Sequence, residues 1–129
     1  MIGYASVGAN DLDRALGFYD AVLGELGAKR VMTMPDQRGW TMYGAGRGKP
    51  MLAVTRPYNG GEARPGNGTM VALAVDSREQ VDRVHARAME HGGTDEGAPG
   101  VRGGVPGQEF YGAYFRDPDG NKICAYKLG

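Results

Sequence analysis

The chain has 129 residues, and its 15 Lys and Arg balance its 15 Asp and Glu, so the formal net charge at pH 7 is zero. This length suits one domain, and without a run of like charge we expect no nucleic-acid or membrane partner. The single cysteine, Cys124, excludes an internal disulfide, and the lack of an export leader or a long apolar run favours a cytoplasmic protein.

The first half predicts a strand, a helix and a strand meander. Residues 2–8 alternate in character as a strand does. Asn10 or Asp11 can then cap a helix that Gly27 can end. The apolar residues of this helix recur at the spacing of one buried stripe: Leu12, Ala15, Leu16, Tyr19, Val22, Leu23 and Leu26. Three apolar segments separated by turn residues follow and predict strands: residues 28–34, 39–44 and 51–56.

The second half repeats this pattern after a polar connection at residues 57–68 that is rich in glycine and proline. Residues 69–75 predict a strand. Ser77 and Gln80 form a capping box for a second helix, which ends at Gly92-Gly93.

A Gly-rich loop and a hairpin complete the second half. Gly97–Gln108 is interpreted either as a mobile lid over a binding site or as a surface loop, and the sequence does not choose between them. Residues 112–116 and 121–127 predict two strands, joined by the tight turn Asp117-Pro118-Asp119-Gly120.

The two halves align as copies of one module. A shift of 66 residues places Tyr4 opposite Met70 without a gap through the first strand and helix. Aligning the turns before the last strands gives a shift of 72 residues, which places Leu52 opposite Cys124. The chain is therefore predicted to be a duplicated module.

Two motifs accompany this repeat: Gly8-Ala9-Asn10-Asp11-Leu12 before the first helix, and Tyr114-Phe115-Arg116-Asp117-Pro118-Asp119-Gly120-Asn121 near the C-terminus. Together they resemble the vicinal-oxygen-chelate superfamily of glyoxalases, bleomycin resistance proteins and extradiol dioxygenases, over almost the whole chain. The resemblance implies an α+β fold with two tandem βαβββ modules, residues 1–58 and 67–129, joined by a linker at 59–66. These modules would form a curved mixed sheet around a small-molecule cup. Many members pair, so the resemblance also implies a homodimer.

The family's metal ligands lie on the first and last strands of each module, and the resemblance carries them to Tyr4, Leu52, Met70 and Cys124. Divalent ions in such sites need carboxylate, carbonyl or imidazole groups, and only Cys124 in this set is a suitable donor. His85 and His91 are six residues apart on a predicted helix, so they point in different directions and cannot chelate one ion. We therefore expect no metal and no other cofactor.

Strand alternation predicts which side chains face the cup: Tyr4, Ser6, Trp40, Met42, Leu52, Val54, Met70, Ala72, Tyr114, Cys124 and Tyr126. The predicted ligand-binding residues among them are Tyr4, Trp40, Met42, Leu52, Met70, Tyr114 and Cys124. An apolar, aromatic set is typical of a concave small-molecule site, although the same side chains would also fill the cup as core. Tyr114 is either an active-site tyrosine, as in some family dioxygenases, or a cross-strand aromatic. Cys124 is interpreted as a small buried hydrophobe rather than a nucleophile.

Three functions stay open from the sequence. The preferred hypothesis is a metal-free, non-catalytic protein that binds an apolar or aromatic small molecule, as the antibiotic-resistance members of the family do. The first alternative is a metal-independent lyase or isomerase of the glyoxalase kind that uses Tyr4, Tyr114 or Cys124 as acid–base groups. The second is an accessory dimerisation module with a vestigial cup. The sequence determines neither the ligand nor the dimer geometry.

Overall fold

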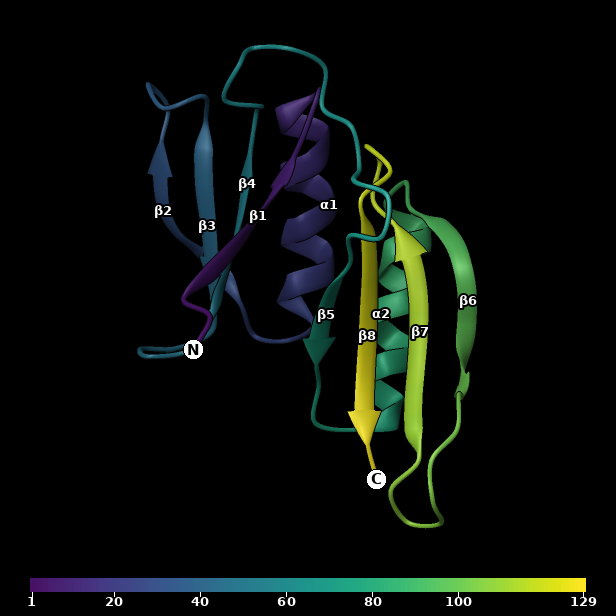
Figure 1. Ribbon diagram of the computed structural model, residues 1–129. Coiled ribbons are helices and arrows are strands. Elements are labelled where there is room, and N and C mark those ends of the chain that lie inside the picture. Colours follow the sequence, from purple (N-terminus) through teal and green to yellow (C-terminus); the bar gives the residue numbers. More distant parts are fainter.

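The computed structural model describes residues 1–129 as two βαβββ modules, which confirms the predicted α+β class (Figure 1). The first module contains β1 (Tyr4–Gly8), α1 (Leu12–Gly24), β2 (Lys29–Met34), β3 (Trp40–Gly44) and β4 (Met51–Thr55). The second module contains β5 (Val71–Ala74), α2 (Arg78–Glu90), β6 (Thr94–Val101), β7 (Phe110–Arg116) and β8 (Lys122–Leu128).

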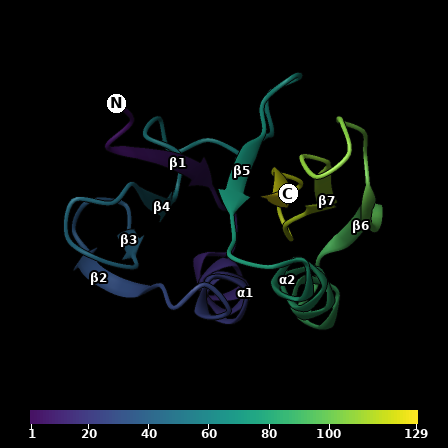
Figure 2. The same ribbon diagram turned by 90° about the horizontal axis from the view of Figure 1, so that it is seen from below.

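Each module forms its own four-stranded mixed sheet. The strand orders are β1-β4-β3-β2 and β5-β8-β7-β6, and in each sheet the first strand of the module runs parallel to the last. Figure 2 shows both helices side by side on the same side of the two sheets. The opposite faces carry no helix, and we call them the first and the second concave face.

The two helices begin where the sequence predicts. Asp11 caps α1 by accepting a hydrogen bond from the backbone amide of Arg14 at 3.1 Å. Ser77 caps α2 in the same way at 3.1 Å from the amide of Gln80, whose side chain accepts the amide of Asp76 at 2.8 Å. These bonds satisfy amides that the first helical turn leaves free, so a local sequence pattern is enough to start each helix.

The hydrophobic core lies between the helices and the sheets and is continuous across both modules. One cluster of 20 buried residues includes members of α1, α2 and both sheets. Phe18 of α1 reaches the second module, where its ring lies 6.1 Å from the ring of Phe115 between centroids. The modules therefore share one core rather than two.

The turn at residues 117–121 joins the modules through polar contacts. Asp117 is almost completely buried and accepts a hydrogen bond from the hydroxyl group of Tyr19 in α1 at 2.6 Å. The side-chain amide of Asn121 donates to the backbone carbonyl of Gly8 at 2.9 Å. The predicted hairpin turn is therefore also a contact between the modules.

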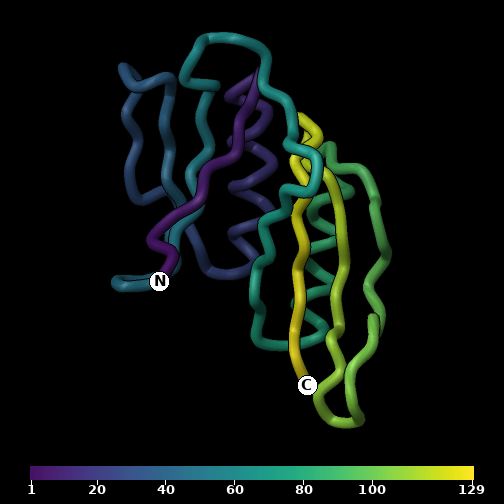
Figure 3. Tube along the Cα trace, viewed as in Figure 1, coloured from purple at the N-terminus to yellow at the C-terminus, as the bar shows by residue number.

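The connection between the modules runs from the end of β4 to the start of β5 and contains no strand or helix (Figure 3). It is attached to the first module at Ala63. The side chain of Asn10 accepts a hydrogen bond from the Ala63 amide at 2.7 Å and donates one to the Ala63 carbonyl at 3.2 Å.

The register of β4 differs from the prediction by one residue. In both sheets a core-facing residue of the last strand, Leu52 or Ile123, pairs with equivalent first-strand residues that are 66 apart. Leu52 and Ile123 are 71 residues apart, not 72, so Ala53 rather than Leu52 corresponds to Cys124. A slip of one residue inverts the faces of a strand. The predicted cup positions of Leu52 and Val54 were therefore wrong, because both residues pack in the core beneath α1.

Part of the predicted Gly-rich loop is a strand. β6 extends through Val101, with register shifts at Gly97 and Gly100. A Cβ atom would lie 3.1 Å from an Arg102 guanidinium nitrogen at Gly97 and 3.0 Å from one at Gly100. The two glycines therefore allow the guanidinium group to lie close against the strand. That the remaining loop acts as a lid stays a prediction.

Candidate binding site

The first concave face carries a group of aromatic and methionine side chains. Ladder partners point to the same side of a sheet, and successive residues alternate between its faces. This face therefore presents Tyr4, Ser6, Met32, Met34, Trp40, Met42, Met51, Ala53 and Thr55. The rings of Tyr4 and Trp40 meet edge to face at 5.7 Å between centroids. Tyr4 exposes 55% of its surface and Met32 exposes 48%, so a ligand can reach this apolar surface.

Sequence alternation identified part of this face. Tyr4, Trp40 and Met42 lie on the concave side, where the alternation put them, and their role in binding stays a prediction. Sequence reasoning missed Met32 and Met34. Their spacing of two within a predicted strand was the signal that pointed to them.

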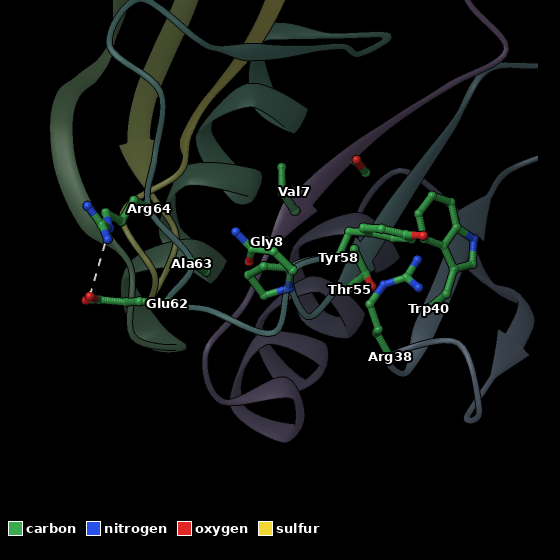
Figure 4. Close-up of a pocket in the computed structure, with 12 residues that line it drawn as sticks. Val7, Gly8, Arg38, Trp40, Thr55, Tyr58, Glu62, Ala63 and Arg64 are labelled. Atoms are coloured by element: carbon green, nitrogen blue, oxygen red, sulfur yellow. Dashed lines mark ion pairs between the residues drawn. The ribbon is translucent and has the colours of Figure 1, made fainter.

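A pocket of about 480 Å³ opens at one end of the first concave face (Figure 4). Ser6 and Trp40 line it, together with Arg38, Thr55 and Tyr58, which the sequence did not single out. The guanidinium carbon of Arg38 lies 4.7 Å from the centroid of the Tyr58 ring, in a cation–π contact. The pocket thus combines aromatic walls with hydroxyl groups and a cation.

The second concave face presents Ala72, Tyr114, Cys124 and Tyr126, as alternation predicted. The charged groups of Arg102 and Lys122 each lie 5.5 Å from the centroid of the Tyr114 ring. Burial raises the pKa of the Cys124 thiol and of the Tyr114 hydroxyl, so both groups are protonated near neutral pH. Cys124 has no accessible surface, which fits a buried hydrophobe better than a nucleophile.

An apolar cleft of about 640 Å³ lies between the two modules. Leu52 and Met70 line it, together with Leu23 and Leu26 at the end of α1. The predicted binding residues thus lie on three surfaces: Tyr4, Trp40 and Met42 on the first concave face, Leu52 and Met70 along the cleft, and Tyr114 and Cys124 on the second face. A single chain does not gather them in one cup, because its two sheets are separate.

The positions that the resemblance assigned to metal ligands do not fit a divalent ion. Tyr4, Met70 and Cys124 lie on different surfaces, and Leu52 belongs to the core. Ala53, which takes the place of Leu52 in the corrected register, has no side-chain donor atom. No three His, Cys, Asp or Glu side chains come together in an arrangement that would hold a metal. The donor chemistry at these positions therefore differs from that of a metal-binding family member.

Both histidines belong to α2 or its end. The ring of His85 pairs with the carboxylate of Asp95 in β6 at 2.9 Å. His91 is the C-terminal capping residue of the helix, where a positive charge suits the helix dipole. The two side chains therefore stand apart from both concave faces.

The sequence matches the model of the Glyoxalase/Bleomycin resistance protein/Dioxygenase superfamily over residues 1–125. The protein is a member of this glyoxalase superfamily. The resemblance read from the repeat and the two motifs is thereby confirmed. No protein of curated function matches the sequence significantly.

Solved structures of other glyoxalase-superfamily members share the fold of this protein. A glyoxalase/bleomycin resistance protein from Albidiferax ferrireducens T118 is 40% identical, with a TM-score of 0.84 and 98% of each chain covered. A glyoxalase-related enzyme from Fulvimarina pelagi is 22% identical, with a TM-score of 0.73 and coverage of 98% of this chain and 87% of that one. A lactoylglutathione lyase from Agrobacterium tumefaciens is 23% identical, with a TM-score of 0.67 and coverage of 98% and 92%. The last two show the fold alone.

Neither helix of this glyoxalase-superfamily protein has the length and apolar character needed to cross a membrane. Each contains 13 residues. A membrane-spanning helix needs about 20.

Proposed function

We propose that this protein binds a small apolar or aromatic molecule on its first concave face without a metal ion. The observation that carries the proposal is the group of rings and thioethers on that face: Tyr4, Met32, Met34, Trp40, Met42 and Met51. Apolar side chains left in water do not stabilise a fold, and a concave group of them is typical of a surface that receives an apolar partner.

The side chains of this face suit ligands with rings. Methionine has three rotatable side-chain bonds and a polarisable sulfur, so it adapts to apolar partners of different shape. Because Tyr4 and Trp40 meet edge to face at 88°, their ring faces do not cover one another and are available for stacking. Such a ring contact contributes about 0.5–1.5 kcal/mol beyond the burial of its area.

We also propose a homodimer in which a second copy covers part of the concave surface. Every side chain of the edge strand β2 is exposed, and Val31 in that strand exposes 53% of its surface. An uncovered edge strand with apolar side chains favours association. Sedimentation equilibrium should give twice the monomer mass, and a monomer at micromolar concentration would contradict the dimer.

A metal-independent lyase or isomerase is the second candidate. The observation that favours it is the pair of cations at Tyr114, because Arg102 and Lys122 have the charge needed to stabilise an enolate oxygen. The raised pKa of Tyr114 and of Cys124 counts against it, since neither group is available as a base at neutral pH. Binding without catalysis therefore ranks first.

Titration with a panel of aromatic metabolites and antibiotics tests the binding proposal. Trp40 is the only tryptophan, so quenching of its fluorescence reports directly on the first concave face. Calorimetry should show Trp40→Ala weakening the binding by about 2- to 12-fold, the equivalent of one lost ring contact. Tyr114→Phe changes the other concave face and serves as the matched control, with affinity expected within twofold of the original protein. Circular dichroism checks that both variants are folded.

Two outcomes would contradict this proposal. A ligand whose affinity falls with Tyr114→Phe but not with Trp40→Ala would move the site to the second face and favour the lyase. A stoichiometric divalent ion, found by elemental analysis and native mass spectrometry of freshly purified protein, would refute the metal-free state.

A further inference from the structure

The pocket beside the β2–β3 turn contains an arginine that the chain does not neutralise. Arg38 makes no ion pair with any carboxylate of the protein. Its Nε atom is shielded from solvent and has no hydrogen-bond partner. A guanidinium group that loses water on burial normally recovers hydrogen bonds from acceptor atoms. This nitrogen therefore lacks an acceptor within the chain.

The backbone holds Arg38 in a conformation that residues with side chains rarely adopt. Its φ of 57° is the only positive value outside glycine. The Arg38 carbonyl accepts a hydrogen bond from the Arg56 amide at 3.1 Å. The next residue, Gly39, packs so closely that a Cβ atom would lie 2.1 Å from Leu12 Cδ2. Such strain persists only where the surrounding structure enforces it, which is typical of functional positions.

The side chains around Arg38 suit a ring that carries a negative charge. Figure 4 shows its guanidinium group, the Tyr58 ring and the Trp40 indole gathered at one end of the pocket. The carboxylate of Glu62 lies at the other end, where it pairs with Arg64 at 3.9 Å. The negative side chain of the pocket is therefore matched by its own partner, and Arg38 keeps its charge available.

We propose that this pocket binds a planar ring that carries a carboxylate or phosphate group. Arg38 binds the anionic group through its guanidinium nitrogens, which match the geometry of both anions. Trp40 and Tyr58 contact the ring. The inference rests on the proposed function and narrows it, because the ligand of the first concave face becomes an aromatic anion.

Calorimetric titration with three matched naphthalene compounds tests the charge preference. The probes are 2-naphthoate, 2-naphthyl phosphate and the neutral 2-naphthamide. We expect the preferred anion to bind about 10- to 100-fold more tightly than the amide, because hydrogen bonds to charged groups are the stronger ones. The order of the two anions then distinguishes a carboxylate site from a phosphate site.

Two arginine variants assign the preference to Arg38. Arg38→Asn removes the guanidinium group, and asparagine tolerates a positive φ, so the turn is retained. We expect this variant to lose the preference for the anion and to keep its affinity for the amide within twofold. Arg56→Gln removes a neighbouring cation that does not line the pocket and is the matched control, which should keep the preference.

The outcomes separate this inference from the proposed function. Equal binding of the amide and the anions, or a preference that survives Arg38→Asn, overturns the anion site and leaves an apolar binding face. If none of the three probes binds at millimolar concentration, both proposals are overturned together.

Discussion

Removal of the Tyr19 hydroxyl group tests how strongly the turn at residues 117–121 joins the modules. This hydroxyl donates to Asp117 Oδ2 at 2.6 Å, and Asp117 exposes only 3% of its surface. A hydrogen bond to a charged group contributes about 1.5–3 kcal/mol. In Tyr19→Phe, Asn121 still donates to the same carboxylate oxygen at 2.8 Å, so that oxygen keeps one partner. We therefore expect the free energy of unfolding to fall by about 2 kcal/mol.

Tyr43→Phe is the matched control for this variant. The hydroxyl of Tyr43 also donates to an aspartate, Asp20 Oδ1, at 2.7 Å, but within the first module. The Asp20 side chain is 47% exposed and keeps its ion pair with Arg30, so water replaces the lost bond on the carboxylate. We expect a smaller loss in this variant, below about 1 kcal/mol.

Urea unfolding followed by circular dichroism measures both losses, at one fixed protein concentration because association changes apparent stability. For a domain of this size, the loss expected for Tyr19→Phe lowers Tm by about 6–8 °C. If Tyr19→Phe is no more destabilising than Tyr43→Phe, the buried contact between the modules adds nothing over a half-exposed pair. That result would refute the reasoning.

Two further predictions concern alkaline pH and the register of β4. Burial raises the pKa of Tyr19 and of Tyr43 above the unfolded value near 10, so their stabilisation is complete below about pH 10 and is lost as the pH rises further. Between pH 9 and 12 the Tyr19→Phe, Tyr43→Phe double variant should lose less stability than the original protein, and parallel profiles would count against this linkage. Leu52 exposes 6% of its surface in the core, so Leu52→Ala should lower the free energy of unfolding by about 2–5 kcal/mol. A loss below about 1 kcal/mol combined with weaker ligand binding would return Leu52 to the concave face.

Local sequence patterns were sufficient to predict the modules. The helix caps at Asp11 and Ser77 lie 66 residues apart, and both helices begin directly after them. Caps and apolar stripes involve residues within a few positions of one another, so the chain specifies them without tertiary contacts. Alternation also assigned Tyr114 and Cys124 to the second concave face, because core-facing residues stand between and beside them along the strands.

The face of β4 was beyond this reasoning. The run Met51–Thr55 contains four apolar residues in succession, so its pattern does not distinguish one face from the other. Only the pairing with β1 and β3 decides that Leu52 faces the core while Ala53 faces the concave side. The sequence alignment placed this strand one residue out, and a slip of that size moves every side chain to the opposite face.

The sequence by itself determined the duplicated module, the start of each helix and the apolar, aromatic character of the inward positions. The tertiary structure decided that those positions divide among two concave faces and a cleft, and that Arg38 from a turn stands beside Trp40 and Tyr58. The physical reason is the range of the interactions. Strand alternation acts over neighbouring residues, whereas sheet register, the separation of the two sheets and the contacts of a turn depend on residues far apart in the chain.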